Sequence, residues 1–228
     1  MKNIKHFTFI LFFCKIFAEQ IFYWKIDTKD KIIFLTFDDG PDRVFTYKVL
    51  DILDEYNIKA TFFVLGELVK YNPEVIKEIV KKGHTLGNHT YYHKNYYQLQ
   101  KKYSLQTCKK LLEEDILSTE KEVKKVNENL KIKYLRMPHG FYRKWMDEIV
   151  KKFDYRIVNW SFGCDWQDIP EEIMLKKYCE ALQPGAIFLF HDGGTYKYRN
   201  KTINVLKKFI VYCLQNNYRF DKIENWIK

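Results

Sequence analysis

Glycine, proline and cysteine are scarce in this chain of 228 residues, which contains 9, 5 and 5 of them. This composition excludes collagen-like, low-complexity and disulfide-dense scaffolds. No internal repeat is present, and no glycine-rich phosphate loop follows the first apolar run, which disfavours solenoid and nucleotide-binding folds. The cysteines lack the close pairs of a zinc finger. A globular chain remains, long enough for one domain and short for two.

Apolar runs that could anchor the chain permanently in a membrane are also lacking, because the run near the amino end is too short. This run, Phe7–Cys14, follows two lysines and precedes a small residue, Ala18. The layout is typical of a secretory signal peptide. We therefore expect a signal peptide at 1–19 and a secreted domain at 20–228, located outside the cell or in the cell wall. An uncleaved signal, holding the chain at a membrane, is the alternative.

Four cysteines remain once such a signal is removed: Cys108, Cys164, Cys179 and Cys213. An even number in an exported protein permits disulfide bonds, and four cysteines allow three pairings between which sequence does not choose. Free buried thiols are an equal alternative.

Acidic residues are outnumbered by Lys and Arg, 29 to 39, which gives a formal charge of +10. Such a surplus favours contact with polyanions. The lysines, however, are scattered in pairs such as Lys81-Lys82 and Lys207-Lys208, the pattern of solvated helix faces, and no nucleic-acid-binding module accompanies them. We expect a monomer with no nucleic-acid partner.

Short apolar runs alternate with amphipathic stretches along the chain. The runs predict strands at 22–24, 31–37, 60–65, 132–135, 155–160, 186–190 and 218–220, and the stretches predict helices at 44–56, 74–82, 142–153, 170–182 and 201–215. Between 97 and 129 the pattern predicts one or two further amphipathic helices. This alternation predicts an α/β fold with parallel strands, either a barrel or an open doubly wound sheet.

Two adjacent carboxylates, Asp38 and Asp39, follow the apolar run Ile32–Leu35 and precede a Gly-Pro turn. Both cannot point into a core because the desolvation cost would be too large, so the pair indicates a site at a strand end. Neighbours on an extended backbone face opposite ways, which would divide a ligand role and an acid-base role between them. The alternative for Asp38 is a helix cap, for which Asp42 lies closer to the predicted helix.

Two histidines, His89 and His93, are four positions apart and would lie on one face if this segment were helical. With Asp39 they would provide two imidazoles and one carboxylate, a catalytic zinc set that leaves a position open for water. Asp38 would then take the proton of the attacking water. Two surface histidines in a tyrosine-rich loop are the alternative.

A third group of polar residues follows later predicted strands. His191 follows a fully apolar strand, and as an imidazolium it would donate a proton to a leaving amine. Asp165, just before Trp166, would keep His191 charged, and Arg136 would lower the pKa of Asp38 so that it stays ionised.

These stretches resemble the polysaccharide deacetylases of carbohydrate esterase family 4, which include chitin, peptidoglycan and acetylxylan deacetylases. Residues 36–40, Thr-Phe-Asp-Asp-Gly, are similar to the first motif of the family, and residues 59–64 to the strand after it. Residues 83–93, Gly-His-Thr-Leu-Gly-Asn-His-Thr-Tyr-Tyr-His, are similar to the second motif almost residue for residue. The likeness extends over about 31–220.

The resemblance implies a distorted, incomplete (β/α) barrel that binds one divalent metal ion, usually zinc. It implies that Asp38 is the base, that His191 is the acid, and that the metal is held by Asp39, His89 and His93. The reaction implied is hydrolysis of N-acetyl groups to free amine and acetate, with the oxyanion near the backbone of His139 and Gly140. The expected substrate is a β-1,4-linked N-acetylglucosamine polymer, most of all chitin. Four aromatic residues are candidates for stacking on its sugar rings: Tyr91, Tyr92, Tyr142 and Trp166.

Two positions depart from the family pattern. His139 stands in the third motif, Arg136-Met137-Pro138-His139-Gly140, where an aromatic residue is usual. Phe162 stands in the fourth motif, where the family usually carries an additional Asp. These departures leave open an alternative function, a catalytically weak or inactive protein that binds cell-wall polysaccharide.

Overall fold

The computed structural model describes residues 20–194 and 196–227, so the predicted signal peptide lies outside the described residues. Eight strands form one sheet in the order β1-β6-β5-β4-β3-β2-β7, with β8 paired to β2. Every strand pair is parallel. The strands are β1 (Phe22–Tyr23), β2 (Ile32–Gly40), β3 (Thr61–Val64), β4 (Thr85–Asn88), β5 (Tyr134–Leu135), β6 (Arg156–Val158), β7 (Ile187–His191) and β8 (Arg219–Phe220).

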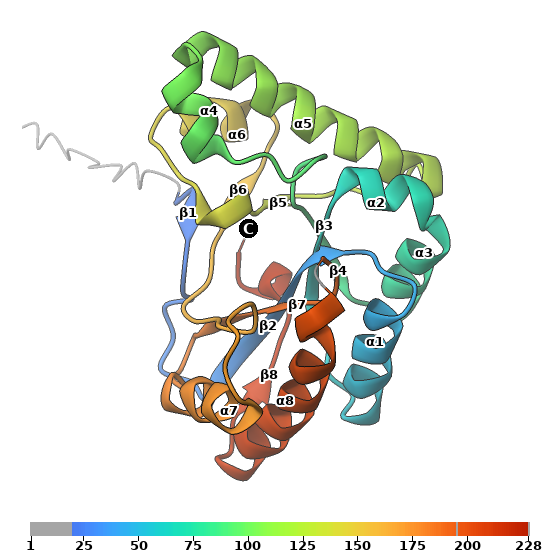
Figure 1. Cartoon of the computed structure of the whole chain (residues 1–228), viewed down its shortest axis with the longest axis vertical. Helices are drawn as coiled ribbons and strands as arrows, with labels where there is room; N and C mark the ends of the chain where they lie inside the picture. The colour runs from blue at the N-terminus through green and yellow to red at the C-terminus, as the bar shows by residue number, and fades with distance from the viewer. Residues whose placement is uncertain (1–19, 195, 228) are drawn as a thin grey trace, which may run out of the picture.

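Helices connect these strands, as parallel pairing requires. They are α1 (Phe45–Glu55), α2 (Gly66–Tyr71), α3 (Pro73–Lys81), α4 (Tyr96–Lys102), α5 (Leu105–Val126), α6 (Met146–Lys152), α7 (Glu171–Glu180) and α8 (Tyr196–Gln215). Figure 1 shows α5 along one end of the molecule, α1 to α3 on one flank, and α7 and α8 at the opposite end. None of the described helices is both long and apolar enough to cross a membrane.

The sheet curls toward a barrel but does not close fully. β1 and β7 lie at its two edges. Between them, single bridges join Lys25 to Ala186 and Phe162 to Phe188 instead of a continuous strand pair. The expected distorted, incomplete (β/α) barrel is therefore confirmed.

The core lies around β2, β3 and β7, whose residues are almost all buried. Their apolar side chains point to both faces because the barrel interior lies on one side and the helices on the other. The ring of Phe37 stacks on those of Phe62 and Phe190, at centroid distances of 5.0 and 6.1 Å. This packing fixes the carboxyl ends of the three strands relative to one another.

Most predicted elements are present, and the differences lie in the bounds of two helices, in a helix that was not predicted, and in the segment that carries His89 and His93. The helix expected at 201–215 begins earlier, at Tyr196, and the one expected at 142–153 is the shorter α6. α2 was not predicted, because its six residues are too few to show a helical period. The segment 89–93 is a loop and not a helix, since Thr90 and His93 have φ values of 68° and 53°.

The four cysteines within the described residues are free thiols. Cys108, Cys164 and Cys213 are buried, and Cys179 is partly exposed. Of the two alternatives left open by the sequence, the structure contains the unpaired thiols.

Tyr178 of α7 links the core to the strand end that carries His191. Its ring stacks on Phe190 at 4.3 Å, and its hydroxyl donates to the carbonyl of Leu189 at 2.7 Å and accepts from the N–H of Cys164 at 3.2 Å. We expect Tyr178→Phe to lower the free energy of unfolding by about 1–3 kcal/mol, because two buried backbone groups lose their partner. Urea denaturation measures the change.

Tyr212→Phe is the matched control, since Tyr212 is 38% exposed on the neighbouring helix α8. We expect it to change the free energy of unfolding by less than about 0.5 kcal/mol. Equal stability of the two variants would contradict the importance of the Tyr178 hydroxyl.

Candidate active site

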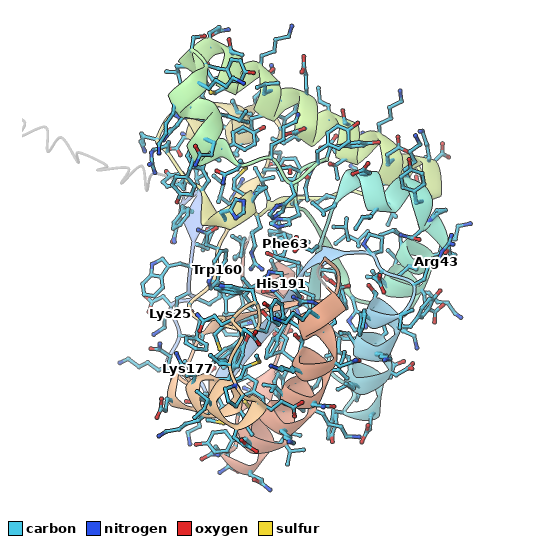
Figure 2. All side chains as sticks on the ribbon, in the orientation of Figure 1. Lys25, Arg43, Phe63, Trp160, Lys177 and His191 are labelled. Carbon is cyan, nitrogen blue, oxygen red and sulfur yellow. The ribbon has the colours of Figure 1, made fainter. Side chains whose placement is uncertain are left out.

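A pocket of about 430 Å³ opens at the carboxyl ends of the strands. It is lined by Asp38, Asp39, His89, His93, His139, Trp160, Trp166, Leu189 and His191. Figure 2 shows Trp160 and His191 near the centre of the molecule, with Lys25, Arg43 and Lys177 toward its outside. A larger hollow of about 710 Å³ lies at the amino ends of β4 and β5, and its lining combines His84 with lysines and apolar residues. The chemistry expected from the sequence is gathered in the smaller pocket.

Asp38 and Asp39 both face this pocket, so the expectation that they point in opposite directions was wrong. The Oδ2 of Asp38 lies 3.6 Å from the Nε2 of His89, and the Oδ1 of Asp39 lies 3.5 Å from the same atom. Two features break the regular alternation of β2: its register shifts between Asp38 and Gly40, and Asp39 has a φ of 69°. A left-handed residue at the strand end turns its side chain to the side that its neighbour already faces.

His89 is oriented by a backbone contact. Its Nδ1 lies 2.7 Å from the carbonyl oxygen of Arg136. Because a carbonyl only accepts, Nδ1 carries the proton and Nε2 presents its lone pair to the two carboxylates. Burial lowers the pKa of His89 to about 3, so this imidazole stays neutral. A neutral ring fixed through its other nitrogen is the usual state of a metal-binding histidine.

His93 completes a group of three possible metal ligands. Its Nε2 lies 3.5 Å from the Oδ1 of Asp39, and one ligand atom from each of Asp39, His89 and His93 lies within 4.8 Å of the others. The Oδ1 of Asp39 is buried and has no hydrogen-bond partner among the described residues. A buried carboxylate oxygen facing two imidazole nitrogens is satisfied by a cation. The donor set therefore fits a divalent metal such as zinc.

Asp38 is held by Arg136, a fully buried side chain from the loop after β5. The guanidinium donates to Asp38 at 2.8 Å and to Thr36 at 2.8 Å, and it lies 4.1 Å over the ring of Phe63. Burial nevertheless raises the pKa of Asp38 above its usual value and outweighs the opposing charge of Arg136. Arg136 lowers this pKa as expected, through its charge and its hydrogen bond, but the effect of burial is larger, so the expected low net pKa is not found. The carboxylate has a higher proton affinity, which favours a general base.

Asp38 does not cap the following helix. That role belongs to Asp42, whose Oδ1 accepts the N–H groups of Val44 and Phe45, both at 2.7 Å. Such a contact satisfies free N–H groups at the start of α1. Asp38 therefore has no capping role and lines the pocket instead.

His191 and Asp165 form the contact expected from the sequence. The Nδ1 of His191 lies 2.8 Å from one oxygen of Asp165, and the backbone N–H of His191 donates to the other oxygen at 2.8 Å. Burial lowers the pKa of His191, but the charge and hydrogen bond of Asp165 outweigh this effect and raise it to about 9. An imidazolium that can donate a proton is thus stable at neutral pH.

Three polar residues of this region were not identified from the sequence. Arg199 and Thr202 of α8 donate to Asp165 at 3.1 and 3.0 Å, and Arg199 also donates to the carbonyl of His191. Arg199 and Thr202 are three positions apart on one helix and so share a face. This spacing did not reveal that their common partner is Asp165. Asp192 is buried beside the pocket and accepts a hydrogen bond from Thr46 at 2.5 Å.

His139 and Gly140 lie in a short 3₁₀ turn, Pro138–Gly140, at the rim of the pocket. The N–H of Gly140 donates to the carbonyl of Met137, and the N–H of Phe141 donates to the carbonyl of Pro138. The turn is therefore closed by donors other than the N–H of His139. The ring of His139 lies 4.9 Å from that of His93. His139 can therefore contact both His93, a possible metal ligand, and a molecule bound in the pocket.

Among the aromatic candidates, Trp166 lines the pocket and is 42% exposed, with its ring edge-on to His191 at 5.6 Å. Trp160, not identified from the sequence, also lines it. Tyr91, Tyr92 and Tyr142 are not among the residues that line this pocket.

The comparisons with known proteins agree with this geometry. Residues 25–158 match the model of a family described as polysaccharide deacetylase. A peptidoglycan-N-acetylglucosamine deacetylase of Bacillus cereus is 34% identical over 209 residues, which cover 90% of this chain and 92% of that protein. A chitooligosaccharide deacetylase of Sinorhizobium fredii is 29% identical over 191 residues, 78% of this chain and 83% of its own length.

Solved structures share the fold. A peptidoglycan N-acetylglucosamine deacetylase superposes with a TM-score of 0.81 at 28% identity, covering 91% of this chain and 93% of that one. A mutant of a family 4 pseudoenzyme, with restored enzymatic activity, superposes with a TM-score of 0.78 at 25% identity, covering 91% and 71%. Because the family match spans more than half of the chain and the Bacillus cereus relative nearly all of it, this chain belongs to the polysaccharide deacetylase family.

Proposed function

We propose that this protein is a secreted, metal-dependent deacetylase of a β-1,4-linked N-acetylglucosamine polymer. The observation that carries the proposal is the convergence of Asp39, His89 and His93 beside the carboxylate of Asp38. The relatives named above act, by their names, on peptidoglycan and on chitooligosaccharides. Both contain N-acetylglucosamine, and within this class we propose chitin as the substrate.

The metal would be held by Asp39, His89 and His93. When bound, a divalent ion would polarise the amide carbonyl and lower the pKa of water. Asp38 would take the proton of the attacking water as the water oxygen bonds to the carbonyl carbon. Arg136 keeps the carboxylate of Asp38 in place through its 2.8 Å contact. The N–H of His139, at the rim of the pocket, would donate to the oxygen that becomes negative.

The second half of the reaction breaks the amide C–N bond. The nitrogen of the sugar leaves as an amine and needs a proton, which His191 donates. Asp165 holds the ring of His191 and stabilises its charged form. The products are acetate and a free amine on the polymer. Trp160 and Trp166 offer flat apolar surfaces at the mouth of the pocket for neighbouring sugar rings.

Metal content is the first test of this function. We expect chelator-free protein to contain one bound divalent ion for each chain, because the three ligand groups converge. Chelation should stop acetate release from chitin oligomers, and zinc should restore it. Elemental analysis and an acetate assay measure both effects, with peptidoglycan and acetylxylan as comparison substrates. Acetate release from metal-free protein would contradict the proposal.

The role of Asp38 is tested by Asp38→Asn. The amide keeps the size of the side chain but accepts no proton, so we expect kcat to fall by about 10²–10⁴-fold while metal content stays unchanged. Asp51→Asn, a change to an exposed residue of α1, is the control and should leave kcat unchanged. Unchanged turnover in Asp38→Asn would remove this residue from the mechanism.

A second candidate function, binding of wall polysaccharide with little turnover, is favoured by His139. Its imidazole lies 4.9 Å from His93 and is a potential competitor for the metal or the substrate. If His139 suppresses turnover, His139→Tyr should raise kcat, because the change removes the imidazole that competes for the metal or the substrate. Steady-state acetate release measures this effect. An unchanged kcat would show that His139 does not limit the reaction.

A further inference from the structure

The loop that carries His93 has an unfavourable backbone conformation. We define the His93 loop as residues 89–95, between β4 and α4. Two of its residues, Thr90 and His93, have positive φ values of 68° and 53° although neither is glycine. Such conformations persist only where the surrounding structure holds them. The loop therefore needs anchors outside itself.

Backbone contacts anchor the first half of the loop. The carbonyl of Thr90 accepts the N–H of Gly66 at 3.0 Å, and the carbonyl of Tyr91 accepts the N–H of Glu67 at 3.2 Å. Both N–H groups lie in the first turn of α2, where the helix itself offers no acceptor. The side chain of Asn88 adds a bond to the N–H of Thr90 at 2.8 Å. These contacts end before His93.

The second half of the loop is anchored by Asp115 on α5. One carboxylate oxygen of Asp115 accepts the ammonium of Lys94 at 2.8 Å, and the other accepts the hydroxyl of Tyr96 at 2.8 Å. Asp115 is only 2% exposed and Tyr96 is fully buried. A buried carboxylate with two donors makes strong, directional contacts. Lys94 directly follows His93, and Tyr96, three positions after His93, is the first residue of α4.

We infer that Asp115 is a positioning residue that holds the His93 loop in its metal-binding conformation and thereby raises the affinity of the site for a divalent ion. This inference rests on the proposed function. Asp115 does not touch the metal ligands, and acts through Lys94 and Tyr96. Without it, the left-handed conformation of His93 would relax, and the ion would have to restore that conformation at the expense of its own binding energy.

The experiment measures the Kd for Zn²⁺ and Co²⁺ in a chelator competition assay, and the melting temperature with and without metal. We expect Asp115→Asn to raise the Kd by about 10-fold, the lower range for residues that support metal ligands. Tyr96→Phe removes one of the two contacts and should raise the Kd by about 3-fold. In both variants the stabilisation by metal should shrink.

The matched control is Glu113→Gln on the same helix. Glu113 accepts a hydrogen bond from the ammonium of Lys152 at 2.9 Å. This ion pair joins α5 to α6 and not to the His93 loop. We expect its Kd to equal that of the unmodified protein. A merely structural role of Asp115 would lower the melting temperature of the metal-free protein and leave the Kd unchanged.

The outcomes separate the two proposals. If the unmodified protein binds Zn²⁺ and Asp115→Asn binds it with the same Kd, the inference about Asp115 is overturned and the proposed function stands. If the unmodified protein binds no divalent ion, the metal-dependent function fails and the inference fails with it. If Asp115→Asn does not fold, Tyr96→Phe decides the question, and an unchanged Kd in that variant overturns the inference.

Discussion

The candidate active site depends on the contact between the carboxyl ends of β2 and β7. The N–H of Asp192 donates to the carbonyl of Asp38 at 3.1 Å, and a Cβ added to Gly193 would lie 1.9 Å from the carbonyl oxygen of Asp39. Only glycine permits this approach. The contact brings the segment after Asp38 against the segment after His191, in the region where Asp39 takes its left-handed conformation. Because Asp39 turns at this point, both carboxylates face the same imidazole. A regular strand end would have placed one of them on the opposite face.

Two buried arginines each contact one carboxylate of the pocket region. Arg136 contacts Asp38, and Arg199 contacts Asp165, which in turn holds His191. The same burial has different results on the two sides: the pKa of Asp38 is raised, while that of Asp165 is lowered because its positive partners outweigh burial. The raised pKa of His191, about 9, follows from the negative charge kept on Asp165. Environments that shift the pKa values of a proposed base, here Asp38, and a proposed acid, here His191, are characteristic of paired proton-transfer groups.

The sequence predicted those parts of the site that local chemistry determines. The convergence of Asp39, His89 and His93 followed from residue type and motif, and most strands followed from short apolar runs. The spacing by four of His89 and His93 did not reveal their conformation, because the same spacing is compatible with a loop in which Thr90 and His93 have positive φ values. Arg199 was missed for a related reason, since its partner Asp165 lies 34 positions away in the chain. The sign of the pKa shift at Asp38 depends on burial, which two neighbouring carboxylates do not reveal.

The two departures from the family pattern have unequal consequences. Phe162 packs edge-on against the ring of Tyr178 at 5.1 Å and forms a bridge with Phe188. A carboxylate at this position would face apolar rings, so phenylalanine suits the environment that this chain provides. Asp165 still receives its donors from His191 and from α8 without any help from position 162. His139, in contrast, lines the pocket and contacts the ring of a proposed metal ligand. Any difference in turnover from other members of the family should therefore arise at the rim of the pocket, where His139 meets His93, and not from the loss of a carboxylate behind His191.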